Sequence, residues 1–175
     1  QTCALPISGG IDSGLTVAIA VDALGKESVQ AVMMPFRYTS EMSIHDAKEQ
    51  ADLLGVEFDT VSIEPMFDAF MDQLSPMFKG SAVDTTEENL QARCRAVILM
   101  AMSNKRRRLV LTTSNKSESA VGYSTLYGDM AGGFDVLKDV PKTLGFELAK
   151  YRNTLSPAIP QRVIDRPPSA ELAPG

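Results

Sequence analysis

The chain of 175 residues is long enough for one domain with a sizeable core, and its 44% apolar and 22% charged residues are ordinary for a globular protein. A net charge of -5 argues against a partner such as a nucleic-acid backbone, and no apolar run approaches the roughly 20 residues that span a bilayer. Two distant cysteines and a single histidine, His45 on an expected exposed helix, leave little material for a disulfide framework, a histidine triad or a zinc site. We therefore expect a reducing, cytoplasmic setting, with no membrane and no nucleic acid as partner.

In chain order, short apolar strands alternate with amphipathic helices. Helices are expected over 14–25, 43–54, 65–74, 84–105, 115–122 and 142–153. Strands are expected over 29–35, 56–63 and 108–113. Thr85 and Glu88 predict a capping box at the start of the longest helix. Prolines dominate from 156 to 175, which predicts a tail that is flexible or depends on a partner for its structure.

This alternation predicts an α/β fold, a doubly wound open parallel sheet with helices on both faces, in a single domain. The first strand would have to come from "QTCALPI", which contains a proline and few β-branched residues where a central strand belongs. We hypothesise that residues 1–6 are not native, and we expect the chain to be truncated at both ends.

The stretch "SGGIDS", from Ser8 to Ser13, combines two glycines, two hydroxyls and a carboxylate directly before a helix. Without Cβ atoms, backbone amides can approach phosphate oxygens closely, and the start of the helix adds a partial positive charge. A carboxylate at Asp12 would repel phosphates, unless it holds Mg²⁺ that bridges them. The stretch therefore predicts a phosphate loop with a magnesium ligand.

Two familiar phosphate-binding patterns are excluded. The loop lacks the Gly-Lys-[Ser/Thr] ending of a Walker A motif, and its glycines do not have the G-x-G-x-x-G spacing of a dinucleotide fingerprint. The alternative without a ligand is a glycine-rich turn with Asp12 or Ser13 as a helix cap.

"SGGIDS" resembles the pyrophosphate loop of the ATP pyrophosphatases, the PP-loop enzymes of adenine nucleotide alpha hydrolase-like fold. "DTTEENLQARCR", "LTTSNKSESAVGYSTLYGDMAGGFDVLKDVPKT" and "RPPSAEL" resemble segments of NAD⁺ synthetases, in particular the synthetase domain of the glutamine-dependent form. The resemblance covers residues 7–172 and keeps the motifs in order.

The resemblance implies a ligase that forms a C–N bond. Such enzymes use ATP and Mg²⁺ to adenylate the nicotinate carboxylate of deamido-NAD⁺, and ammonia then displaces AMP, giving NAD⁺ and pyrophosphate. The ammonia would come from glutamine through a glutaminase domain that normally lies on the N-terminal side. A homodimer around the long helix is also implied.

The resemblance also implies roles for individual residues. Asp12 and Glu118 would hold Mg²⁺, and Lys142 would contact the ATP phosphates; these three would be the catalytic residues. Asn89, Arg93 and Asp135 would bind deamido-NAD⁺, and the spacing of Asn89 and Arg93 places both on one side of a helix. Further ATP contacts are expected from Ile7, Ser8, Gly9, Gly10, Ile11, Ser13, Arg37, Thr113 and Ser169.

Two positions depart from the family pattern. Leu126 stands where ammonia-dependent members carry a lysine, and Ser114 occupies a position that is commonly glycine in the glutamine-dependent form. Two alternatives remain open: another PP-loop ligase, similar to GMP synthetase or to a tRNA-modifying enzyme, and a catalytically weak nucleotide-binding fragment.

Overall fold

The computed structural model describes residues 2–168 and 171–173, which form one parallel sheet of five strands in the order β3-β2-β1-β4-β5. The strands are β1 (Cys3–Pro6), β2 (Val29–Met33), β3 (Glu57–Thr60), β4 (Leu109–Thr112) and β5 (Phe134–Asp135). All four strand pairs are parallel, so every strand has its carboxyl end at the same edge of the sheet. The sequence analysis missed β5, because two residues are too few to show a periodic pattern.

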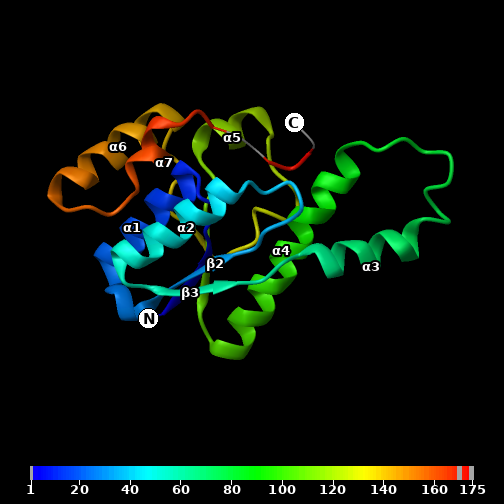
Figure 1. Ribbon diagram of the computed structural model, residues 1–175, viewed down its shortest axis with the longest axis horizontal. Coiled ribbons are helices and arrows are strands. Elements are labelled where there is room, and N and C mark those ends of the chain that lie inside the picture. The colour runs from blue at the N-terminus through cyan, green and yellow to red at the C-terminus, as the bar shows by residue number, and fades with distance from the viewer. Residues whose placement is uncertain (1, 169–170, 174–175) are drawn as a thin grey trace.

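Helices cover both faces of this sheet (Figure 1). They are α1 (Ile11–Leu24), the 3₁₀ turn η1 (Lys26–Ser28), α2 (Glu41–Leu54), α3 (Glu64–Leu74), α4 (Thr85–Arg106), α5 (Lys116–Val121), α6 (Lys142–Leu155) and α7 (Gln161–Asp165). One apolar cluster joins the sheet to α1, α2, α6 and α7, and a second joins it to α3 and α4. The predicted doubly wound α/β fold is confirmed.

The first strand, β1, forms the centre of the sheet, although its sequence contains a proline and few β-branched residues. Cys3, Ala4 and Leu5 are almost fully buried, and β1 pairs with both β2 and β4. Pro6 is the last residue of the strand and faces a partner only in β2, so its missing N–H removes little from the ladder. The ladder then resumes, because the amide of Ile7 donates to the carbonyl of Val32 at 3.0 Å.

The predicted capping box of α4 is displaced by one residue. Asp84, not Thr85, is the N-cap: its carboxylate accepts from the amide of Thr86 at 2.8 Å. Glu87, not Glu88, completes the box by accepting from the amide of Asp84 at 3.0 Å. An aspartate is at least as good a cap acceptor as a threonine, which explains the shift.

The expectation of a flexible tail is wrong for the first part of residues 156–175. Ala158, Ile159, Val163 and Ile164 are buried in the cluster beneath α1 and α6. The side chain of Asn153 accepts from the amides of Ala158 and Ile159 at 3.1 and 3.0 Å, which ties this segment to α6. The segment is ordered because it covers apolar surface that α6 alone leaves open.

None of the helices in the described part of the chain combines the length and the apolar character needed to cross a membrane.

Candidate nucleotide site

The predicted phosphate loop joins the carboxyl end of β1 to the start of α1. Gly9 has a φ of +74°, and a Cβ atom there would lie 2.3 Å from the carbonyl oxygen of Ser43, so only glycine fits. Ser8 and Ser13 brace the loop: their hydroxyl oxygens lie 3.0 Å apart, and Ser13 Oγ donates to the carbonyl of Gly10 at 3.1 Å. In the part of the chain that the structure describes, no side chain caps the N-terminus of α1, so its first amides are available to an anion.

Three helices bring the predicted catalytic residues together. Asp12 lies in the first turn of α1, Glu118 in α5 and Lys142 at the start of α6. The ammonium group of Lys142 pairs with Asp12 and lies 3.7 Å from Glu118 Oε1. Asn115 caps α5 by accepting from the amide of Glu118 at 3.0 Å, and its Nδ2 donates to Asp12 Oδ1 at 3.2 Å. Asn115 therefore ties the carboxylate of Asp12 to the backbone that carries Glu118.

The two carboxylates influence each other. Partial burial raises the pKa of Glu118, and the negative charge of Asp12 raises it further, against the opposing effects of Lys142 and of the hydrogen bonds from Asn115. Two carboxylates that share a partly buried place are stabilised by a divalent cation, and carboxylate oxygens are the ligands that Mg²⁺ prefers. The donor set therefore fits the predicted magnesium ion.

A cavity of about 440 Å³ lies at this edge of the sheet, and a second one of about 240 Å³ adjoins it. Predicted residues that line the larger cavity are Ser8, Gly10, Ile11, Asp12, Ser13, Thr113, Glu118 and Lys142. Those that line the smaller one are Ile7, Ser8, Gly10 and Thr113. This is the position at which open α/β sheets bind ligands, beyond the carboxyl ends of the strands.

The residues predicted to bind the second substrate lie outside both cavities. Asn89 accepts from Thr125 Oγ1 at 2.8 Å, and Arg93 donates from Nε to the carbonyl of Leu126 at 3.2 Å. Both therefore face the same segment, as their spacing predicts. Asp135, in β5, accepts a hydrogen bond from Ser114.

Among the described residues, two predicted ATP contacts do not line the cavities. The guanidinium of Arg37 pairs with Glu64 at 2.7 Å and Asp68 at 2.6 Å, so α3 engages it instead. Gly9 lines neither cavity, although its backbone shapes the loop. Ser169 falls outside the described residues.

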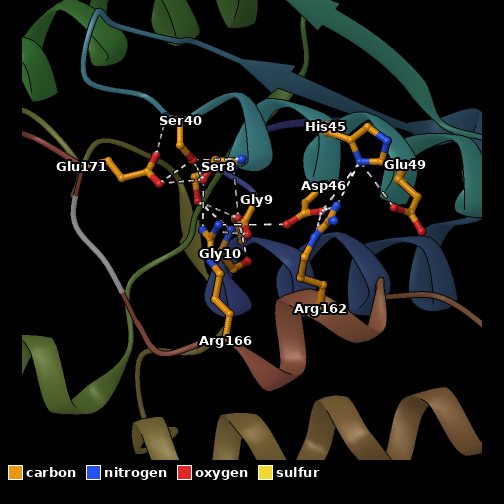
Figure 2. A network of polar contacts seen from close by, with 12 residues as sticks. Ser8, Gly9, Gly10, Ser40, His45, Asp46, Glu49, Arg162, Arg166 and Glu171 are labelled. Atoms are coloured by element: carbon orange, nitrogen blue, oxygen red, sulfur yellow. Dashed lines mark hydrogen bonds and ion pairs between the residues drawn. The ribbon is translucent and has the colours of Figure 1, made fainter.

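Sequence reasoning missed residues that the fold places here. Asp129 and Arg166 line both cavities, and Asn115 donates to the carboxylate of Asp12. A signal for Arg166 was present in "RPPSAEL", since this arginine directly precedes two prolines and follows Arg162 by one helical turn. Figure 2 shows Arg166 beside the loop residues Gly9 and Gly10.

Comparison with known proteins shows that the chain is similar to a known group. The family model of NAD synthase matches residues 1–175. Glutamine-dependent NAD(+) synthetase of Acinetobacter baylyi is 63% identical over 97% of this chain and 32% of its own length.

Two solved structures are also similar. Glutamine-dependent NAD+ synthetase from Acinetobacter baumannii, in complex with ADP, superposes with a TM-score of 0.93 at 61% identity, covering 94% of this chain and 32% of that one. NH3-dependent NAD synthetase from Campylobacter jejuni superposes with a TM-score of 0.82 at 33% identity, covering 93% of this chain and 66% of that one.

The chain thus spans about a third of the length of the curated relatives it matches. The phosphate loop, the paired carboxylates with their lysine, and a match over the full sequence agree: the chain belongs to the NAD synthase family.

Proposed function

We propose that this chain is the synthetase part of an NAD⁺ synthetase, a ligase that uses ATP and Mg²⁺ to convert deamido-NAD⁺ and ammonia to NAD⁺, AMP and pyrophosphate. The observation that carries the proposal is the group of Asp12, Glu118 and Lys142 beside the phosphate loop, at the edge of a cavity of about 440 Å³. The names of the similar proteins support the choice of substrate.

The reaction needs no nucleophilic side chain. An oxygen of the nicotinate carboxylate attacks the α-phosphorus of ATP, the bond from that phosphorus to the bridging oxygen breaks, and pyrophosphate leaves with that electron pair. Ammonia then attacks the carbonyl carbon of the mixed anhydride, loses a proton and displaces AMP. Catalysis is therefore a matter of position and charge, which is what this site offers.

Each residue has a role that its position supports. Backbone amides of the loop and the N-terminus of α1 receive phosphate oxygens, and Lys142 neutralises the charge that grows on pyrophosphate. Asp12 and Glu118 would hold Mg²⁺, which supplies a Lewis acid for the phosphate oxygens. Asn115 orients the carboxylate of Asp12 and fixes the backbone at Glu118.

For deamido-NAD⁺ we propose Asn89, Arg93 and Asp135, outside the two cavities. Asn89 and Arg93 both contact the segment of Thr125 and Leu126, so a substrate seated there would order that segment. Exposed apolar side chains on α4, such as Val97, support a homodimer around this helix. A glutaminase domain would supply ammonia, as the names of the glutamine-dependent relatives suggest.

The test is to incubate the chain with ATP, Mg²⁺, deamido-NAD⁺ and an ammonium salt, and to measure NAD⁺ and pyrophosphate. We expect both products in equal amounts, and a loss of about 100-fold or more in rate for Asp12→Asn, a size typical for one removed charge-stabilising group. Asp52→Asn is the matched control, because Asp52 is an exposed carboxylate paired with Lys48. Absence of both products, or full pyrophosphate release by Asp12→Asn, would contradict the proposal.

A further inference from the structure

The two cavities at the carboxyl edge of the sheet meet at a small set of shared residues. Among the described residues, six line both: Ser8, Gly10, Thr113, Asp129, Arg166 and Leu172. Of these six, Arg166 alone carries a positive charge. The question is what a positive charge does at this junction.

The contents of the two cavities differ. The larger one contains Lys142, Asp12 and Glu118, the groups suited to Mg²⁺ and a pyrophosphate. The smaller one contains the apolar side chains of Met33, Met34 and Leu99, which suit a flat base. Since Ser8 and Gly10 of the phosphate loop line both, a nucleotide that fills both cavities has its first phosphate at the junction.

The guanidinium of Arg166 is held against the loop from the side of α7 (Figure 2). Its Nη2 donates to the carbonyl of Gly9 at 3.3 Å and to the hydroxyl of Ser43 at 3.0 Å. Its Nη1 lies 4.0 Å from Asp46 Oδ2, and only 17% of the side chain is exposed. Among the described residues, neither Nε nor Nη1 has a hydrogen-bond acceptor, so two nitrogens can still donate.

The backbone holds this position before any ligand arrives. Arg166 ends α7, because the two prolines that follow disfavour helical backbone at this residue. Arg162, four residues earlier, pairs with the same fully buried carboxylate of Asp46. The two arginines thus share one anchor, but Arg162 lines neither cavity.

A nearby carboxylate does not neutralise this arginine directly. Glu171 lines the smaller cavity, but its oxygens accept from the amide of Ser40 at 3.1 Å and from the hydroxyls of Ser40 and Ser43 at 2.8 and 2.9 Å. Glu171 therefore fastens the C-terminal segment to the start of α2, opposite Arg166, as Figure 2 shows.

We propose that Arg166 binds the α-phosphate of the nucleotide and stabilises the charge that develops on it during adenylation. The inference rests on the proposed function, since it concerns the phosphorus that the substrate carboxylate attacks. While the new P–O bond forms and the bond to pyrophosphate breaks, the two non-bridging oxygens stay on the α-phosphorus, where the nitrogens of Arg166 that lack an acceptor would donate to them. Arginine suits this task because its planar fork matches two phosphate oxygens.

The test compares four ligands by isothermal titration calorimetry with the chain: adenosine, AMP, MgATP and magnesium pyrophosphate. AMP differs from adenosine only by the α-phosphate, and pyrophosphate lacks that group altogether. The unmodified chain should prefer AMP to adenosine. In Arg166→Met this preference should fall by about 10- to 100-fold, the usual value of a hydrogen bond to a charged group, with pyrophosphate affinity unchanged.

Two variants are matched controls. Arg162→Met removes the other arginine on Asp46, and should leave all four affinities as they are. Lys142→Met should weaken MgATP and pyrophosphate and keep the preference for AMP. Arg166→Lys keeps the positive charge but lacks the planar guanidinium group, and it should recover part of the preference for AMP. If circular dichroism shows that Arg166→Met is unfolded, the affinities of Arg166→Lys provide the test.

The outcomes separate the two proposals. The inference on Arg166 is wrong if Arg166→Met, or Arg166→Lys where only that variant folds, keeps the parent's preference for AMP. It is also wrong if Arg162→Met lowers that preference equally, because Arg166 would then act only through the fold. If the parent binds MgATP and pyrophosphate but does not prefer AMP, the inference falls and the proposed function stands. If the parent binds neither, the proposed function falls with it.

Discussion

Two carboxylates at opposite ends of the same sheet have pKa values shifted in opposite directions. At the carboxyl end, burial and the nearby Asp12 raise the pKa of Glu118. At the amino end, partial burial acts to raise the pKa of Glu57, but hydrogen bonds and attraction from Arg108 and Arg106 outweigh it and lower the value. Glu118 shares one lysine with Asp12, whereas Glu57 pairs with two arginines.

At the amino end of the sheet, Glu57, Gln30, Arg106 and Arg108 form a cluster whose charged groups are paired with one another. Arg108 Nη1 donates to Glu57 Oε2 and to Gln30 Oε1, both at 2.6 Å, and Arg106 donates to Glu57 Oε1 at 2.6 Å. None of these residues lines either cavity. This cluster includes Arg106 and Arg108, two residues of the basic run 105–108 at the end of α4, which bind the side chains of Gln30 in β2 and Glu57 in β3.

The comparison teaches that a group of charges does not by itself mark a site. Both ends have carboxylates, cations and amide side chains within hydrogen-bond reach. Only the carboxyl end combines them with a cavity, a helix N-terminus and carboxylates that lack enough positive charge. Stability should therefore depend on the amino-end cluster and ligand binding on the carboxyl-end cluster, and the following changes test that division.

The largest effect is expected for Lys142→Met. Loss of a charge-assisted contact should weaken binding of magnesium pyrophosphate by about 10- to 100-fold. Titration calorimetry measures the affinity, and Lys48→Met, which removes an exposed lysine paired with Asp52, is the control. If Lys142→Met and Lys48→Met bound magnesium pyrophosphate with equal affinity, Lys142 would serve only to neutralise the charge of Asp12.

Arg108→Met should act on stability alone. It leaves the oxygen of Gln30, a fully buried side chain, without its arginine partner, which should cost about 1–3 kcal/mol of unfolding free energy. Urea unfolding measures this, with exposed Lys105→Met as the control, and magnesium pyrophosphate affinity should not change. A loss of ligand affinity would show that the two ends of the sheet are coupled.

Glu57→Gln should change how stability depends on pH. Because the pKa of Glu57 is lowered in the folded state, its ionised form stabilises the fold above the ordinary pKa of 4.5, and this contribution is lost as the pH falls through the lowered value. Since the side chain is 44% exposed, we expect a loss of less than about 1 kcal/mol at neutral pH. Unfolding curves of the two proteins should converge in acid; a constant difference would refute the assignment.

The smallest effect on stability, and one of opposite sign, is expected for Glu118→Gln. Its raised pKa means that folding is penalised at neutral pH, and the penalty disappears as the pH falls below the ordinary value. The neutral amide should stabilise the chain by about 1 kcal/mol or less, in thermal melts with a chelator present, and should weaken magnesium pyrophosphate binding. If Glu118→Gln were less stable than the parent chain, the carboxylate of Glu118 would not be a group that binds the ligand while it destabilises the fold.

The local sequence determined the elements and the loop. The phosphate loop consists of neighbours in the chain: glycine at position 9, hydroxyls at 8 and 13 and a carboxylate at 12. The loop could therefore be predicted from the sequence without knowledge of the fold. The same holds for the longest helix, whose cap was misplaced by only one residue. Short-range rules of spacing and capping are enough for features of this kind.

Tertiary structure decided which distant residues meet. Asp12 and Lys142 are 130 positions apart, and the crossing of α1, α5 and α6 joins them; only the family resemblance anticipated that meeting. The central place of β1 and the ordered segment 158–164 came from the packing of apolar surface, which no local pattern encodes. The physical reason is that burial depends on all neighbours at once, so a weak strand or a proline-rich segment becomes ordered where the rest of the core needs cover.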